Sequence, residues 1–415
     1  MRVCVVGAGA REHAIAEGLA VDADEVVVTP GNAGIPWSTD AAVEDVDADL
    51  YVIGPEGPLA DGLADRLRAD GKVVLGPSRE ASALESSKQW AKDAMAELGI
   101  PTARAVAFDD ADAALAHLER SGGPYVVKAD GLAEGKGVLV TSSRMEARAD
   151  IVAKLSGAAF GEAGRVVVIE EALTGRELSV FGVTDGKDVV ALPCARDYKP
   201  VFDGNAGPNT GGMGAFSPVP GFSRDDVDDL IDRFATPMVG LLRDRGLLYR
   251  GFVYVGLIET EDGMKVIEYN VRFGEPEAQV VLPRVRSGLA PLLHSAAVGS
   301  LDRAAHALSE DAAVTVMMAT EGYPGPSRLG DVIDGVAAAA ALDGVRLYWK
   351  GVKLGDGSLV TSGGRVLSVT GIGPTLAEAR ATAYRGVGAM SWPGEHHRSD
   401  VAADPGVADG SLPVW

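Results

Sequence analysis

The sequence predicts a multidomain chain of the α/β and α+β classes, with an N-terminal doubly wound parallel-sheet domain, a central unit with a mobile lobe, and a small β-rich C-terminal domain. Short apolar runs alternate with helical stretches over about the first hundred residues. Further along, a glycine-rich hairpin joins two strand-like runs. After Tyr323 the composition turns to alanine, glycine and short strands. A chain of 415 residues has room for two or three domains.

In the N-terminal domain, placed at residues 1–100, each apolar run is followed by Gly or Pro, and the runs are Val3–Val6, Val26–Thr29, Leu50–Ile53 and Lys72–Leu75. A helix is expected from Arg11 to Ala20. Another is expected from Ser86 to Leu98, ended by Gly99 and Pro101. Parallel strands gather their loops at one edge of the sheet, and ligands bind there.

The central unit is placed at residues 101–320, with the mobile lobe at about 121–190, and the C-terminal domain at residues 321–415. The expected strands of the central unit are Tyr125–Lys128, Val138–Thr141, Val166–Glu170, Phe252–Glu259 and Met264–Tyr269. Its expected helices lie near Arg144–Leu155 and between Arg224 and Arg245.

The bulk composition disfavours several classes of protein. Apolar residues make up 47% and charged residues 23%, as in folded soluble proteins. The formal charge of -21 repels polyanions, so neither nucleic acids nor anionic membranes are expected partners. No apolar run approaches the roughly 18 residues of a membrane helix. Two cysteines cannot form a disulfide framework, and a cytoplasmic location is expected.

Two N-terminal loops are candidates for ligand contact. Gly7-Ala8-Gly9 follows a strand, but a dinucleotide fingerprint needs a small residue where Glu12 stands, which argues against a dehydrogenase. Gly9 then belongs either to a turn that meets another ligand or to a tight turn without one. The loop Thr29–Gly34 offers Asn32 and Gly34 to a phosphate, although many loops share this composition.

Two segments of the expected lobe suit a nucleotide. One strand carries Lys128 and the following glycine hairpin carries Lys136, so two ammonium groups can neutralise a triphosphate; the Walker A pattern is absent. Another apolar strand leads into acids, where backbone groups can meet an adenine edge and a carboxylate can meet ribose hydroxyls, unless the acids form a solvated turn. The candidate ATP contacts are Lys128, Lys136, Glu170, Glu171, Leu173 and Glu177.

A glycine-rich loop at Gly207–Gly214 has the composition of a pocket lining for a small substrate. It combines four glycines with short polar side chains, and Asp197 and Lys199 lie just upstream. We expect Asp197 and Lys199 to be catalytic. The candidate substrate contacts in the loop are Asn209, Thr210, Gly211, Gly212 and Met213.

The most informative segment is Val266–Glu277. Alternate residues of a strand share a face, so Glu268, Asn270 and Arg272 point the same way. Carboxylate and amide oxygens are hard ligands that suit Mg²⁺. An arginine beside them can clamp a phosphoryl group or an oxyanion, as a catalytic residue. A buried polar stripe without such a purpose would be costly.

These motifs, in this order, resemble the phosphoribosylamine–glycine ligase family. The resemblance runs from Val3 to about His397 and is most specific at Gly207–Gly214 and Arg272–Glu277. It implies an ATP-grasp core and the ligation of glycine to 5-phosphoribosylamine through glycyl phosphate, which gives glycinamide ribonucleotide, ADP and phosphate. It further implies ATP and Mg²⁺ (or Mn²⁺), a monomer, and a substrate contact from Glu56 in Gly54-Pro55-Glu56.

The sequence departs from the family's usual residues at Ala10, Ser86, Pro200 and Glu275. Two alternatives stay open from the residues. One is another ATP-grasp ligase with a different acid or amine. The other is a nucleotide sensor without catalysis, which the row of Glu268, Asn270 and Arg272 argues against, because binding alone needs no clamp on the γ-phosphoryl group.

Overall fold

The computed structural model describes residues 1–133 and 137–404. At the N-terminus, four parallel strands form a sheet in the order β2-β1-β3-β4, which confirms the predicted parallel sheet. Its strands are β1 (Arg2–Gly7), β2 (Glu25–Pro30), β3 (Leu50–Ile53) and β4 (Val74–Leu75). The helices of this part are α1 (Ala10–Leu19), α2 (Glu56–Ala60), α3 (Leu63–Ala69), α4 (Ala83–Ser86) and α5 (Lys88–Leu98), with the 3-10 turn η1 (Val43–Asp45).

One expected helix is divided in two. The helix predicted from Ser86 to Leu98 instead begins at Lys88, because Ser87 has an extended backbone and its hydroxyl caps α5 by accepting from the Trp90 amide at 3.1 Å. Residues before the cap form the separate short helix α4. The predicted end is confirmed, since Gly99 closes α5 in the left-handed conformation at φ 65°.

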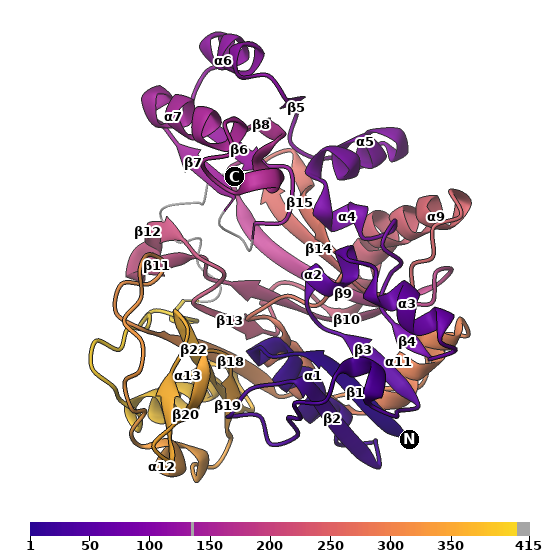
Figure 1. Cartoon of the computed structure of the whole chain (residues 1–415), viewed down its shortest axis with the longest axis vertical. Coiled ribbons are helices and arrows are strands. Elements are labelled where there is room, and N and C mark those ends of the chain that lie inside the picture. The colour runs from indigo at the N-terminus through magenta and orange to yellow at the C-terminus, as the bar shows by residue number, and fades with distance from the viewer. Residues whose placement is uncertain (134–136, 405–415) are drawn as a thin grey trace.

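A small lobe stands apart from the rest of the molecule at the top of Figure 1. Its antiparallel sheet has the order β5-β8-β6-β7, and the predicted pairing of the two hairpin strands is confirmed. The strands are β5 (Ala105–Phe108), β6 (Tyr125–Ala129), β7 (Val138–Thr141) and β8 (Val167–Glu171). The helices are α6 (Ala111–Arg120) and α7 (Arg144–Leu155), with the turn η2 (Gly161–Gly164).

An eight-stranded antiparallel sheet forms the middle of the molecule, in the order β15-β14-β9-β10-β13-β18-β22-β19. Its strands are β9 (Arg176–Thr184), β10 (Val189–Asp197), β13 (Gly214–Ser217), β14 (Gly251–Thr260), β15 (Gly263–Asn270), β18 (Ala312–Ala319), β19 (Val345–Trp349) and β22 (Arg365–Gly373). β18 and β22 lie on either side of residue 320, so this sheet runs across the predicted boundary there. The division at residues 100 and 320 stays a prediction.

Smaller elements surround this sheet. Three two-stranded sheets pair β11 (Pro200–Phe202) with β12 (Ala206–Asn209), β16 (Val285–Ser287) with β17 (Ala307–Leu308), and β20 (Val352–Gly355) with β21 (Ser358–Thr361). The helix expected between Arg224 and Arg245 forms as α8 (Arg224–Leu230), the π-helical turn η4 (Ile231–Ala235) and α9 (Thr236–Asp244). The others are η3 (Asp203–Asn205), α10 (Ala278–Val281), η5 (Leu282–Arg284), α11 (Leu289–Val298), α12 (Val336–Ala340) and α13 (Leu376–Gly388).

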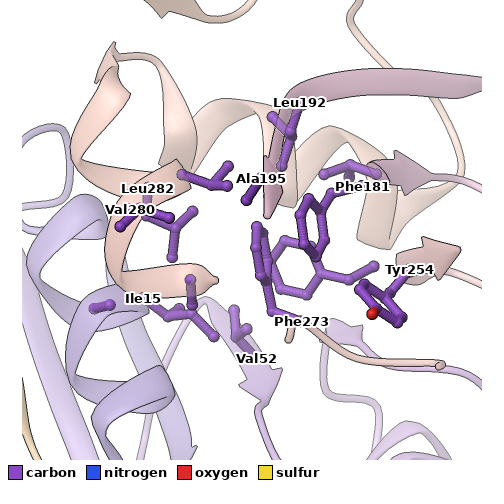
Figure 2. Packing of buried hydrophobic residues seen from close by; sticks show 14 of the residues in the cluster. Ile15, Val52, Phe181, Leu192, Ala195, Tyr254, Phe273, Val280 and Leu282 are labelled. Atoms are coloured by element: carbon purple, nitrogen blue, oxygen red, sulfur yellow. The ribbon is translucent and has the colours of Figure 1, made fainter. Parts of the chain in front are cut away.

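The apolar core of the lobe is separate from that of the other two large sheets. One large cluster joins the N-terminal sheet, the eight-stranded sheet and the C-terminal strands. Figure 2 shows its centre, where Ile15 of α1 lies beside Val280 and Leu282, and Phe273 stacks on Phe181 of the large sheet. The lobe has a separate cluster built around Val127, Ile151 and Ile169. The lobe therefore has its own core, as a unit that moves against the rest would need.

Two general features agree with the composition. Cys4 and Cys194 are both free and buried. Among the residues that the structure describes, no helix has the length and apolar character to cross a membrane.

Candidate functional site

Two adjoining cavities lie between the lobe, the large sheet and the N-terminal loops. The smaller, of about 770 Å³ with its opening to solvent, is lined by Lys88, Lys92, Lys128 and Glu170 among others. The larger, of about 1640 Å³, reaches from β15 to the loops of the C-terminal strands. Both are lined by Glu56, Glu268, Asn270 and Arg272. These residues form the boundary at which groups held in the two cavities can meet.

The row Glu268, Asn270 and Arg272 converges as strand alternation predicts. The Asn270 amide nitrogen donates to Glu268 Oε1 at 3.1 Å, and Arg272 Nη2 donates to Asn270 Oδ1 at 3.4 Å. Arg272 lies just past the end of β15, and the next residue fixes it. The ring of Phe273 is fully buried and stacks on Phe181 with 4.6 Å between centroids (Figure 2). Aromatic packing thus holds the backbone beneath the arginine.

Glu268 and Asn270 offer the oxygen donors that a hard divalent cation prefers. Burial raises the pKa of Glu268, but the Lys199 ammonium group and the Asn270 hydrogen bond outweigh it, so the pKa is lowered and the carboxylate stays ionised. The side-chain amide of Asn270 now donates its nitrogen to Glu268, so it must flip before its oxygen and the Glu268 carboxylate can face one ion. No cluster of three His, Cys, Asp or Glu side chains that could hold a metal occurs in residues 1–133 and 137–404. The pair therefore fits an ion that takes further ligands from phosphate and water.

Arg272 is held by two carboxylates, one of which the sequence did not reveal. Its Nε lies 3.1 Å from Glu56 Oε2, and its Nη2 lies 2.8 Å from Glu85 Oε1. Glu85 is buried at the end of α4, where it also accepts from the Val271 amide at 2.8 Å. Although burial lowers the pKa of Arg272, Glu85 and Glu56 raise it well above its usual value. The guanidinium is therefore charged and oriented before any ligand arrives.

A second charged group surrounds Glu170 in the smaller cavity. Lys128 Nζ lies 2.9 Å from Glu170 Oε2, and Lys92 Nζ lies 3.2 Å from Oε1. Burial lowers the pKa of Lys92 to about 8, although Glu170 raises it. Lys88 lines the same cavity, where burial lowers its pKa although Glu268 raises it. Three ammonium groups on one cavity wall suit a polyphosphate, and Lys88 and Lys92 extend the predicted pair; Lys136 lies outside the described residues.

Lys199 and Asp197 form a partly buried ion pair at the wall of the larger cavity. Lys199 Nζ lies 3.0 Å from Asp197 Oδ1 and 2.6 Å from Glu177 Oε2. Burial lowers the pKa of Lys199, but Asp197 and Glu177 raise it well above normal. Glu177, which the sequence predicts beside the nucleotide ribose, begins β9 with Arg176 and pairs with Lys199, and its contact with a ribose stays a prediction.

Two other residues expected to contact ATP line neither of these cavities. β8 alternates, so Glu170 faces the lysines while Glu171 faces away and pairs with Arg104 at 2.7 Å. Leu173 is buried in a small apolar cluster with Ala103, Ile258 and Ile267. The contact predicted with an adenine edge uses backbone groups, so it stays a prediction whichever way these side chains face.

Three N-terminal residues expected to meet a substrate make close contacts within the protein. The Asn32 side chain donates to the Ala8 carbonyl at 2.8 Å and to the Trp349 carbonyl at 3.1 Å. A Cβ on Gly34 would lie 2.2 Å from the Trp349 ring, so the glycine permits close packing. The Gly9 amide donates to Glu12 at 2.7 Å. Asn32 and Gly34 fix their loop against the end of β19, and none of the three residues lines either cavity described above.

The Gly207–Gly214 loop contributes part of the lining predicted for it. Asn209, Thr210 and Gly211 line the larger cavity. Gly212 and Met213 do not: Gly212 is buried, and Met213 is fully buried against Val201 and Ala319. Met213 is therefore an apolar anchor of the loop and not a substrate contact, since its side chain points into the core.

Family models of phosphoribosylglycinamide synthetase match the chain in three parts. The N domain matches residues 1–85, the ATP-grasp (A) domain residues 86–278 and the C domain residues 313–404. The predicted fold class, with its ATP-grasp core, is thereby confirmed.

Relatives that match this chain over nearly their whole length are described as phosphoribosylamine–glycine ligases. A phosphoribosylamine–glycine ligase from Streptomyces coelicolor is 45% identical, over 97% of this chain and 99% of its own length. One from Brucella melitensis is 42% identical, over 97% of both chains. The crystal structure of phosphoribosylamine–glycine ligase from Thermotoga maritima is 34% identical and superposes with a TM-score of 0.84, over 96% of this chain and 100% of that one. The motifs, the two adjoining cavities and these likenesses agree: the chain belongs to the phosphoribosylamine–glycine ligase family.

Proposed function

We propose that the chain joins glycine to 5-phosphoribosylamine at the expense of ATP, giving glycinamide ribonucleotide, ADP and phosphate. The observation that carries this proposal is the row Glu268, Asn270 and Arg272 on the boundary of both cavities. ATP held among the lysines of the smaller cavity has its γ-phosphoryl group at that boundary. Glycine and the amine then occupy the larger cavity, from which the same residues can be reached.

The reaction takes place in two steps. A glycine carboxylate oxygen attacks the γ-phosphorus and ADP leaves, which converts a poor electrophile into glycyl phosphate. The amine nitrogen then attacks the acyl carbon, phosphate leaves, and the nitrogen loses a proton. Phosphoryl transfer depends on positioning and charge neutralisation, which Lys88, Lys92 and Lys128 supply around the polyphosphate. Arg272 lies where it can neutralise the transferring group and the tetrahedral oxyanion.

Mg²⁺ or Mn²⁺ is the proposed cofactor, with Glu268 and Asn270 as its protein ligands. Such an ion neutralises phosphate charge and polarises the transferred group. The ionised state of Glu268 supports this assignment. Asp197 and Lys199 are proposed to orient the glycine or the leaving phosphate from the wall of the larger cavity, which they both line.

The assay that tests the function is glycine-dependent release of ADP, with phosphoribosylamine generated in place. Turnover with glycine and none without it is the expected result. ADP release with another carboxylic acid and none with glycine would favour a different ATP-grasp ligase. ATP held without turnover under any of these conditions would favour a nucleotide sensor.

A monomer in the cytoplasm is the assembly and location that we propose. The charge of -21 supports dispersal of single chains by mutual repulsion. Light scattering on the purified chain tests the first part, since a mass near 42.8 kDa is expected. A mass twice as large would overturn it.

A further inference from the structure

A second pair of cations lies on a part of the cleft wall that the nucleotide lysines do not reach. Lys350 directly follows β19 and Arg365 begins the neighbouring strand β22. Both line the larger cavity and neither lines the smaller one. The Lys350 side chain is 32% exposed and that of Arg365 is 12% exposed. The pair is therefore open to a ligand in the larger cavity.

One buried carboxylate holds both cations. Glu275 Oε1 lies 2.6 Å from Lys350 Nζ and 3.0 Å from Arg365 Nη2, while Oε2 accepts from the Arg11 amide at 3.1 Å. Burial raises the pKa of Glu275, but Lys350 and Arg365 lower it well below its usual range. Burial and Arg365 lower the pKa of Lys350, although Glu275 raises it. One carboxylate thus neutralises only one of the two cations, so a further anion would be stabilised beside them.

The backbone around Lys350 and Arg365 is closely packed and fixed in shape. Arg365 Nη1 donates to the carbonyls of Gly211 and Gly212, which holds the guanidinium in place. A Cβ on Gly351 would lie 2.5 Å from the Arg365 carbonyl oxygen, and one on Gly364 would lie 2.5 Å from the Tyr323 ring. Glycine at these positions lets the chain segments on both sides of the cations come close together. The cations are therefore positioned before a ligand binds.

We propose that Lys350 and Arg365 bind the phosphate monoester of the ribosylamine substrate, with Glu275 as their positioning residue. The inference rests on the proposed function, in which one substrate carries a phosphate that is not transferred. That phosphate needs cations of its own, because the lysines around Glu170 serve the polyphosphate. Charge-assisted contacts from an ammonium and a guanidinium suit a phosphate dianion. The larger cavity is also lined by Glu268 and Arg272, so a ribose bound there can extend its amine towards the acyl phosphate.

The test measures how strongly the protein prefers a phosphorylated ligand. Calorimetry gives the affinity for glycinamide ribonucleotide and for the same nucleoside without its phosphate, in the wild type and in Lys350→Met. Loss of one charged contact to the phosphate should reduce the preference about 10- to 100-fold. Lys350→Arg should retain most of it. Lys353→Met is the matched control, because Lys353 is an exposed lysine of β20 outside the cleft, and its preference should equal that of the wild type.

Steady-state kinetics separate the possible outcomes. In Lys350→Met, the KM for phosphoribosylamine should rise while the KM values for glycine and ATP stay unchanged. An unchanged preference for the phosphorylated ligand in an active, folded Lys350→Met protein would overturn the inference. So would a rise in the KM for ATP alone, which would assign Lys350 to the nucleotide. A wild type that binds the ribonucleotide but releases no ADP with glycine would refute the proposed function and leave the phosphate site standing.

Discussion

Glu268 is the single residue on which the proposed metal site most depends, because it supplies the ionised oxygen beside Asn270. In Glu268→Ala, Mg²⁺-dependent turnover should fall by at least about 100-fold, the range seen when one charge-stabilising group is removed. The far-ultraviolet circular dichroism should stay unchanged. Glu259→Gln on the neighbouring strand is the control, since Glu259 pairs with Arg176 at 2.6 Å and lines neither cavity. Near-normal turnover in Glu268→Ala would show that the metal assignment is wrong.

Glu277 makes the stability of the protein depend on pH. It is buried in contact with Ser179, whose hydroxyl donates to Oε1 at 3.1 Å. Burial and the nearby Asp197 carboxylate raise its pKa to about 7, although Lys199 lowers it. In the folded protein Glu277 keeps its proton up to about pH 7, whereas in the unfolded chain it loses the proton near pH 4.5. Protonated Glu277 therefore favours folding at low pH, and this contribution to stability is lost as the pH rises to 7.

The corresponding prediction concerns Glu277→Gln, which keeps the shape and removes the titration. Between pH 4.5 and 7, the stability of the wild type relative to this variant should fall by on the order of 3 kcal/mol. Urea unfolding at a series of pH values measures the difference. Glu261→Gln, at an exposed position, should follow the wild type throughout. Parallel pH profiles for wild type and Glu277→Gln would contradict the assigned titration.

Strand alternation explains which parts of the site were predictable. Residues two apart on one strand share a face, so the row from Glu268 to Arg272 could be placed from the sequence. The same rule explains why Glu171 turns away from the cavity that Glu170 lines. Glu85 and Lys350 could not be found this way, because they meet Arg272 and Glu275 only through contacts between distant segments. No local pattern records such contacts.

Packing between distant elements gives a prediction for Gly34. Its loop meets Trp349 at the end of β19 so closely that a Cβ would lie 2.2 Å from the ring. In Gly34→Ala, the loop or the ring must move, and unfolding should become about 1–3 kcal/mol easier. Gly57→Ala in α2 is the matched control, because a Cβ there meets nothing within 4 Å and alanine favours a helix. Thermal unfolding of both variants gives the comparison, and equal stability of Gly34→Ala and wild type would contradict the close contact.

At the scale of the whole molecule, the lobe has an apolar core separate from the large one, and this division limits how a local defect can spread. The lobe packs around Val127, Ile151 and Ile169, while the N-terminal and C-terminal parts share the large cluster. β6 and β8 carry Lys128 and Glu170 from the lobe into the smaller cavity, whereas Arg272 stands on the large core. Closure of the lobe would therefore bring Lys128 towards a fixed arginine and exclude water from a labile acyl phosphate.

Ile151→Ala tests this division. Ile151 of α7 is fully buried in the lobe core, so its truncation should cost about 2–5 kcal/mol there. Amide hydrogen exchange should rise in the strands and helices of the lobe, while the eight-stranded sheet keeps its protection, because the two cores are separate. ATP turnover should fall together with the order of the lobe. Val152→Ala changes the adjacent, exposed residue and should leave both exchange and turnover near wild type. Loss of protection spread evenly over the chain would mean that the lobe does not unfold as a unit.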